Sequence, residues 1–76
     1  MDWRLYIAAD PAIVHGTACF NGTRIPVSVV LDKLAYGEMP ERILEQYASL
    51  RQEHILAALA YAADLARERA NEIPTG

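Results

Sequence analysis

The sequence is poor in the devices that commonly stabilise very small proteins. Its 76 residues include one cysteine, Cys19, so no disulfide can form within the chain. No group of His and Cys residues has the spacing of a metal site. A chain this short buries only about 60% of the surface that its unfolded form exposes. We therefore expect the folded protein to gain stability from partner chains, as a homodimer or a larger oligomer.

The sequence also lacks an excess of positive charge. Seven Lys and Arg residues stand against ten Asp and Glu residues, giving a net charge of -3, and the acidic excess falls after Gly37. Autonomous binding to nucleic acid draws on a basic face, which this chain does not display. No apolar run reaches the about 18 residues of a membrane span, and no leader pattern is present. The sequence predicts a soluble, cytoplasmic protein with no membrane contact.

No motif of an enzyme is present either. His15 and His54 are far apart in the sequence, with no carboxylate or cysteine at ligand spacing. Glu41 and Glu45 lie one helical turn apart, which is typical of a solvated helix face. Cys19 alternates with apolar neighbours, which favours a small buried hydrophobe over a reactive thiol. We expect no catalytic residue, no cofactor and no metal.

The first third of the chain has the pattern of a small sheet. Residues 3–7 alternate apolar and polar side chains, which predicts a half-buried strand. Asn21-Gly22 between two short β-compatible runs predicts a two-residue type I′ hairpin in which Phe20 lies opposite Thr23. Two strands of this length are not stable alone. We expect the strand at 3–7 or the hairpin to pair with another chain through its open edge.

After Pro26 the apolar residues recur with the period of a helix. They predict a helix over about residues 26–36 that ends at Gly37, a short helix over 40–47 that opens at Pro40, and a third helix over 50–70, followed by a tail at 71–76. The sequence thus predicts a single domain over 1–76. Its expected class is mainly α, with a small N-terminal β-strand or hairpin at about 3–25 and a three-helix, helix-turn-helix-like (homeodomain-like) unit.

The third helix has an expected start and an expected apolar face. Ser49-Leu50-Arg51-Gln52 spells a capping box, in which the Ser49 hydroxyl accepts from the N–H of Gln52 and the Gln52 side chain returns to the N–H of Ser49. We therefore expect the helix to begin at Leu50. The residues expected to face the core are Ile55, Leu56, Leu59, Ala62, Ala63 and Ala66.

The second and third helices have the spacing of a helix-turn-helix. Such a motif would bring the start of the third helix to a major groove, where Arg and Gln suit guanine and adenine edges. The same arrangement is also a common way to pack a small helical core. Because residues 40–56 hold two arginines against three glutamates, any DNA binding is expected to be weak and steeply salt-dependent. The candidate contacts to DNA or to a protein partner are Arg24, Arg42, Arg51, Gln52 and His54.

Arg24 has a structural interpretation as well. In the expected hairpin its side chain lies on the face away from Phe20, where its guanidinium could hold a carboxylate or helix carbonyls. We expect this structural role, with a contact to nucleic acid or to a protein partner as the alternative.

Several segments together resemble a known family. Asn21-Gly22-Thr23-Arg24-Ile25-Pro26-Val27-Ser28, then Leu34-Ala35-Tyr36-Gly37, Glu41-Arg42-Ile43-Leu44 and the Ala- and Leu-rich helix at 55–62 are similar to domain-of-unknown-function family 433, over about residues 5–65. The resemblance implies a helix-turn-helix-like fold. It also implies the antitoxin of a type II toxin–antitoxin pair, which binds and neutralises a PIN-like ribonuclease and can repress its own promoter by binding operator DNA.

The acidic balance of the chain fits an inhibitor that occupies the basic cleft of a nuclease. Two alternatives stay open: a helix-turn-helix DNA-binding regulator without a toxin, and a structural module of a larger assembly.

The chain departs from the family's pattern at helix ends. Met39 and Arg51 stand where the family has a Ser or Thr cap, a loss of about 1 kcal/mol each, and Ala48 replaces a proline.

Overall fold

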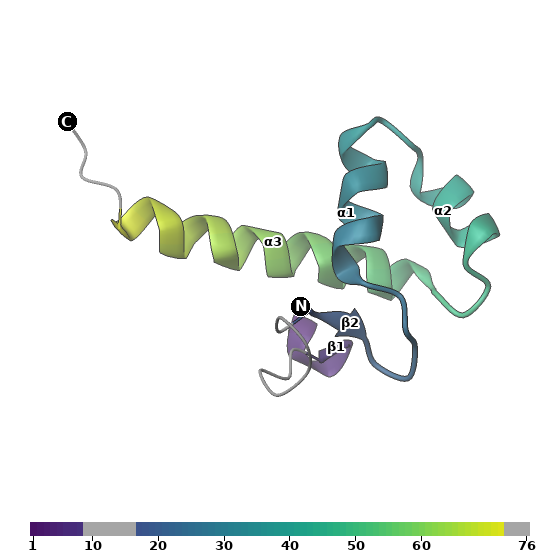
Figure 1. Cartoon of the computed structure of the whole chain (residues 1–76), viewed down its shortest axis with the longest axis horizontal. Coiled ribbons are helices and arrows are strands. Elements are labelled where there is room, and N and C mark those ends of the chain that lie inside the picture. The colour runs from purple at the N-terminus through teal and green to yellow at the C-terminus, as the bar shows by residue number, and fades with distance from the viewer. Residues whose placement is uncertain (9–16, 73–76) are drawn as a thin grey trace.

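The computed structural model describes residues 1–8 and 17–72, with side chains as far as Arg67. Figure 1 shows three helices and a short antiparallel strand pair. The expected class, mainly α with small N-terminal strands before three helices, is confirmed. In chain order the elements are the 3-10 helix η1 (Trp3–Leu5), strands β1 (Ile7–Ala8) and β2 (Cys19–Phe20), and helices α1 (Val27–Ala35), α2 (Pro40–Gln46) and α3 (Gln52–Glu72).

Helix α3 is the element on which the others pack. It contacts η1, α1 and α2, and in Figure 1 α1 and α2 lie on one side of it while η1 and the strands lie on the other. Two fully buried alanines of α3, Ala57 and Ala58, leave room for its neighbours to approach closely. The buried core consists of Ile7, Phe20, Val27, Val30, Ile43, Leu50, Ile55, Ala57 and Ala58.

Helix α1, whose last residue is Ala35, is terminated by Gly37, the residue after its C-cap, as the sequence predicts. The N–H of Gly37 donates to the carbonyl of Leu34 and the N–H of Glu38 to that of Lys33, both at 3.0 Å, which is a Schellman motif. Gly37 has φ of 85°, a left-handed conformation that glycine adopts without strain. The side chains of Lys33 and Glu38, 3.7 Å apart, close the motif with an ion pair.

The expected strand at 3–7 is wrong over most of its length. Asp2 caps a 3-10 turn, because its side chain accepts the N–H of Arg4 at 3.1 Å, and residues Trp3–Leu5 form η1. Only Ile7 and Ala8 are extended, opposite Phe20 and Cys19 of β2. A side-chain cap of this kind stabilises a turn in place of an extended backbone. The alternation of apolar and polar residues over positions 3–7 gives no information about such a cap.

The Asn21-Gly22 turn forms, but the expected pairing around it is wrong by two residues. The N–H of Thr23 donates to the carbonyl of Phe20 at 3.0 Å, and Gly22 has φ of 75°. Phe20 then lies opposite Ile25, whose carbonyl accepts its N–H at 3.1 Å. The cause is the Thr23 hydroxyl, which donates to the Phe20 carbonyl at 2.8 Å and accepts the N–H of Ile25 at 3.1 Å. It holds residues 21–24 as a longer loop.

The expected start of the third helix is also wrong. Helix α3 begins at Gln52, and Ser49 lies in a turn before it. The N–H of Leu50 donates to the carbonyl of Tyr47 at 3.0 Å, and the buried side chain of Leu50 fixes this turn. At its other end the helix extends to Glu72, so residues 71 and 72 are helical instead of part of a tail. His15 and residues 73–76 of the expected tail lie outside the described residues.

Helix α3 turns a different face to the core than expected. Of the expected face, Ile55 is buried, but Leu56 and Leu59 are each 47% exposed, and Ala63 and Ala66 are exposed as well. The core instead contains Ala57 and Ala58, which are not part of the expected apolar face. The helix carries apolar side chains on two sides, so a 3.6-residue period in its sequence does not decide which side faces inward.

Trp3 connects η1 to the middle of α3. Its indole Nε1 donates to Asp64 Oδ2 at 2.6 Å, and its ring meets the edge of Tyr61 with centroids 4.9 Å apart. Arg67 also donates to the Asp64 carboxylate. The hydrogen bond from Trp3, followed by the hydrogen bond and the charge of Arg67, lowers the pKa of Asp64 from its usual 3.8.

We expect the Trp3–Asp64 contact to be lost in acid. Because the folded-state pKa of Asp64 is lowered, the contact stabilises the fold above pH 3.8 and is lost as pH falls through that lower value. Trp3 is the one tryptophan of the chain, so its fluorescence should report the titration. Asp64→Asn should remove this step. A spectrum that does not change between ~pH 5 and ~pH 2, in a chain still folded by circular dichroism, would contradict the assignment.

The loop after β2 should depend on the Thr23 hydroxyl. Thr23→Val keeps the shape of the side chain but removes both of its hydrogen bonds and leaves the N–H of Ile25 without its acceptor. We expect a loss of about 1–2 kcal/mol in the free energy of unfolding, measured by urea denaturation. Thr23→Ser retains the hydroxyl and should stay close to the wild type. Equal stability of the two variants would show that the hydroxyl is not needed.

Candidate functional site

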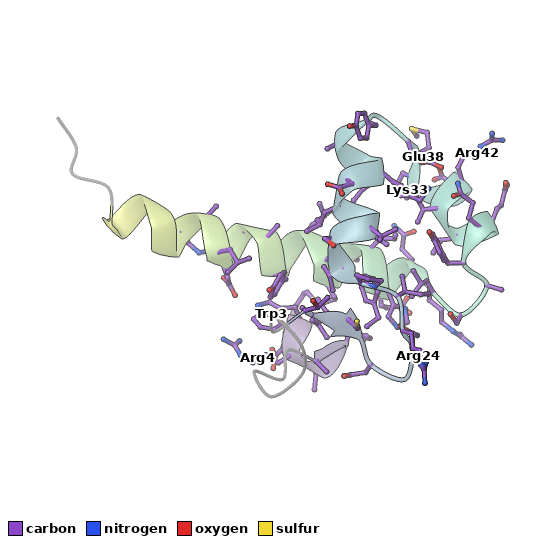
Figure 2. The ribbon with its side chains drawn as sticks, in the orientation of Figure 1. Trp3, Arg4, Arg24, Lys33, Glu38 and Arg42 are labelled. Carbon is purple, nitrogen blue, oxygen red and sulfur yellow. The ribbon has the colours of Figure 1, made fainter. Side chains whose placement is uncertain are left out.

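The candidate contact residues do not form one site. Arg24 lies in the β2–α1 loop, Arg42 on α2, and Arg51 and Gln52 at the start of α3, and all four are exposed. In Figure 2 Arg42 lies at the top of the view on α2 and Arg24 at the bottom in the β2–α1 loop, both directed into solvent. A basic surface of several adjoining arginines, which would be the footprint of a nucleic-acid site, is therefore not assembled from them.

The expected partner of Arg24 is not found. Among the side chains described in residues 1–8 and 17–67, no carboxylate forms an ion pair with its guanidinium. The loop is held instead by Asn21, whose side-chain amide donates to the Leu5 carbonyl at 3.1 Å and whose N–H donates to the Tyr6 carbonyl at 2.8 Å. Within the described side chains Arg24 has no such partner, and its expected structural role stays a prediction.

His54 has a structural task. Its Nδ1 accepts the N–H of Arg51 at 2.9 Å, so that it caps the first turn of α3 from the third helical position, as Glu or Gln does in a capping box. Its ring meets Tyr6 and Phe20 edge-on, each with centroids 5.5 Å apart. These contacts tie His54 to the core, and its expected contact to DNA or to a partner stays a prediction. Its spacing from Arg51, the cap position of the family, is the sequence signal that could have revealed this role.

The solvent face of α3 is apolar after its first turn. Gln52 and Glu53 are exposed at the start. Beyond them lies what we call the α3 stripe: Leu56, Leu59, Ala63 and Ala66, all exposed. A helix that reads base edges presents Arg, Lys, Asn or Gln over successive turns. The stripe contains none of these side chains. Its exposed leucines and alanines are suited to contact an apolar surface of another protein.

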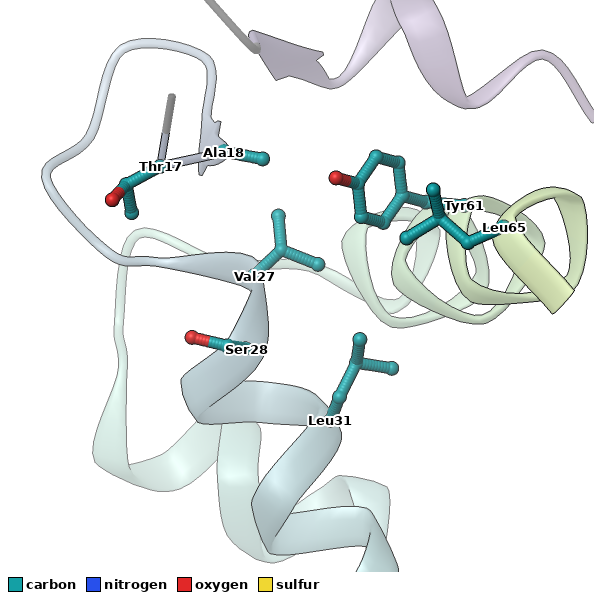
Figure 3. Close-up of a pocket in the computed structure, with 7 residues that line it drawn as sticks. All are labelled: Thr17, Ala18, Val27, Ser28, Leu31, Tyr61 and Leu65. Carbon is teal, nitrogen blue, oxygen red and sulfur yellow. The ribbon is translucent and has the colours of Figure 1, made fainter. Parts of the chain in front are cut away.

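A second apolar surface lies across α3 from the stripe. A hollow of about 340 Å³, here named the α1–α3 hollow, opens between β2, α1 and the middle of α3 (Figure 3). Leu65, on its rim, is 43% exposed. Apart from three hydroxyl groups its lining is hydrocarbon, which suits an inserted apolar side chain. It is lined by Thr17, Ala18, Val27, Ser28, Leu31, Tyr61 and Leu65.

Cys19 borders a separate hollow. This space of about 380 Å³ lies beside the loop at 21–24, and the thiol of Cys19 is free and half-buried. In the part of the chain that the structure describes, no three His, Cys, Asp or Glu side chains gather as a metal site requires. No helix there is both long enough and apolar enough to cross a bilayer.

The cap of α3 should depend on His54 and not on Ser49. His54→Ala removes the acceptor for the N–H of Arg51 together with two ring contacts, and should lower the free energy of unfolding by about 1–2 kcal/mol. His54→Gln, which supplies a capping-box acceptor, should recover part of this loss. Ser49→Ala should change stability by less than about 0.5 kcal/mol. Thermal denaturation of the three variants tests this order, and a larger loss from Ser49→Ala than from His54→Ala would reverse it.

Comparison with known proteins identifies related sequences. The family model described as "Protein of unknown function (DUF433)" matches residues 7–62. A protein of Sinorhizobium fredii (strain NBRC 101917 / NGR234), "Uncharacterized protein y4eO", is 41% identical over 59 residues, which are 78% of this chain and 27% of the relative. The chain therefore spans about a quarter of the length of that relative. No solved structure matches the chain.

Proposed function

We propose, from the premise that this chain belongs to the family of proteins of unknown function DUF433, that it is a non-enzymatic protein-binding module. Its partner, as the family resemblance implies, is a PIN-like ribonuclease that it neutralises as the antitoxin of a type II pair. The observation that carries this proposal is the apolar α1–α3 hollow, together with an α3 solvent face that lacks base-reading side chains. A helix with Leu56 and Leu59 exposed where a DNA-reading helix needs polar side chains is suited to bind protein.

The α1–α3 hollow is the surface that we assign to the ribonuclease. It combines the buried side chain of Val27 with the more exposed Leu31, Tyr61 and Leu65, so that an apolar side chain of the partner could enter and exclude water. Such a pocket at the centre of a contact is where binding energy concentrates. The net charge of -3 would steer the chain towards a nuclease whose RNA cleft is basic.

Two alternatives each have one observation in their favour. Arg51 and Gln52 are both exposed at the start of α3, the part of a helix-turn-helix that reaches DNA. This supports repression of the chain's own promoter, or a DNA-binding regulator without a toxin. The relative of which this chain spans 27% carries the same unit within a longer sequence, which supports an assembly module.

Rescue from toxicity tests the proposal. A PIN-like ribonuclease encoded beside this gene should arrest growth alone and lose that effect when co-expressed with this chain. Leu65→Glu sets a charge at the rim of the hollow and should abolish both rescue and co-purification. Leu5→Glu is the matched control, because Leu5 is 71% exposed and does not line the hollow. It should rescue as well as the wild type.

The outcomes separate the candidate functions. Full rescue by Leu65→Glu would remove the hollow as the binding site, and failure of the wild type to bind the ribonuclease would refute the antitoxin role. Anisotropy with promoter DNA checks the alternative. Weak binding that disappears as salt is raised fits the few arginines available, whereas tight binding that persists at high salt would favour the DNA-binding regulator.

A further inference from the structure

We infer that the α3 stripe binds a second copy of this chain, and that the two α3 helices pair antiparallel about a two-fold axis level with residue 61 along the helix. This inference goes beyond the proposed function and does not depend on which ribonuclease is bound. It assigns an occupant to the exposed face of α3 and leaves the α1–α3 hollow, on the other side of the helix, to the partner protein.

The spacing of the stripe is that of a helix-pairing seam. Leu56, Leu59, Ala63 and Ala66 follow one another at intervals of three, four and three residues, the a and d positions of a heptad. At about 100° per residue these positions point opposite to Ala57, Ala58 and Tyr61, which pack into the chain's own core. One face of α3 thus packs against the rest of the domain, and the α3 stripe lies on the opposite face.

The sizes of the side chains along the seam favour an antiparallel pair. With the two-fold axis at residue 61, Leu56 meets Ala66 of the partner subunit and Leu59 meets Ala63 of the partner subunit. Each large side chain then faces a small one, which lets the two surfaces interdigitate without a void. A parallel pair would instead set leucine against leucine and alanine against alanine, which leaves the C-terminal half of the seam poorly filled.

The charges beside the seam are complementary in the same orientation. Glu53 and Arg67 both flank the stripe at the same heptad position, two heptads apart, and both are exposed. One guanidinium nitrogen of Arg67 donates to Asp64 of its own chain, and the remaining N–H groups can meet a second carboxylate. In an antiparallel pair, Glu53 of one chain approaches Arg67 of the partner subunit, and the two-fold axis repeats this contact at the other end. In a parallel pair Arg67 would face Ala62 and have no carboxylate from the other helix.

The projecting part of α3 gives a reason for the pairing. In Figure 1 the C-terminal half of the helix extends beyond α1, η1 and the strands, and Ala63, Ala66 and Arg67 on it are exposed. An isolated helical arm of this length is marginal in water. Antiparallel pairing lays the arm of one chain along the N-terminal half of the other α3. The open edge of the strands, by contrast, offers only Ile7–Ala8 and Cys19–Phe20 to a partner.

Sedimentation of the full chain over a range of concentrations tests the pairing. The wild type should sediment as a dimer at micromolar concentrations, and Leu59→Glu should shift it to a monomer while retaining the circular dichroism of the folded chain. Leu65→Glu is the matched control, since Leu65 has a similar exposure of 43% but faces the hollow, and it should remain dimeric. A wild type that stays monomeric at on the order of 100 µM would overturn the inference.

Disulfide crosslinking tests the orientation. In a Cys19→Ser background, a mixture of Leu56→Cys and Ala66→Cys chains should form a disulfide between the two variants on oxidation, because the antiparallel register brings these positions together. Leu56→Cys alone should crosslink with itself much less. Efficient self-crosslinking of Leu56→Cys would show a parallel pair and overturn the proposed geometry.

A charge swap and the rescue assay complete the test. Glu53→Lys and Arg67→Glu should each weaken the dimer, and the double variant should recover most of the affinity, since the contact is re-formed with its signs exchanged. Because Arg67 also donates to Asp64 of its own chain, circular dichroism should show that each variant is folded. Failure of the double variant to recover would overturn the proposed contact. Leu59→Glu could instead abolish rescue and co-purification while sedimenting like the wild type. That result would show that the stripe binds the ribonuclease. It would refute the pairing and leave the antitoxin role standing.

Discussion

A single helix with two apolar sides is the constraint on which this small fold depends. The strands have two residues each, η1 has three and α2 seven, and none of them could hold its structure alone. Each is stabilised by side chains that pack on α3 or on an element that itself packs on α3. Ala57 and Ala58, with no exposed surface, set how closely these elements approach, so a larger side chain at either position would force the whole arrangement apart.

The parts of the fold that the sequence predicts correctly are those governed by local backbone chemistry. Gly37 ends α1 because a left-handed residue is needed there, and Pro40 opens α2 because a first-turn proline loses no hydrogen bond. The Asn21-Gly22 turn forms for the same kind of reason. The pairing around that turn was wrong, since it is decided by the hydroxyl of Thr23 acting across the loop, and a two-residue turn rule does not include such a contact.

The candidate site was less accessible to sequence reasoning, for a physical reason. Leu56 and Leu59 were expected inside because apolar side chains run around α3, and periodicity alone ranks neither side above the other. The choice depends on contacts with residues far away in the chain, such as Trp3, which hydrogen-bonds Asp64 and packs on Tyr61 from 58 or more positions earlier. The α1–α3 hollow likewise exists only once β2, α1 and α3 are placed together. The role of His54 as a cap, by contrast, could have been predicted from its three-residue spacing from Arg51.

The two apolar surfaces of α3 would allow one helix to serve both the proposed self-association and the proposed partner binding. Leu59 and Leu65 lie on the same helix but on different sides of it, so an occupant of the stripe would not cover the hollow. A two-fold pair joined along the stripe would carry its two hollows outward, each open to its own partner. Two linked sites of this kind bind a paired partner more tightly than either site alone, without any new contact. The geometry of a helix-turn-helix would then be retained as a scaffold, with the chemistry of its exposed face deciding that the ligand is protein.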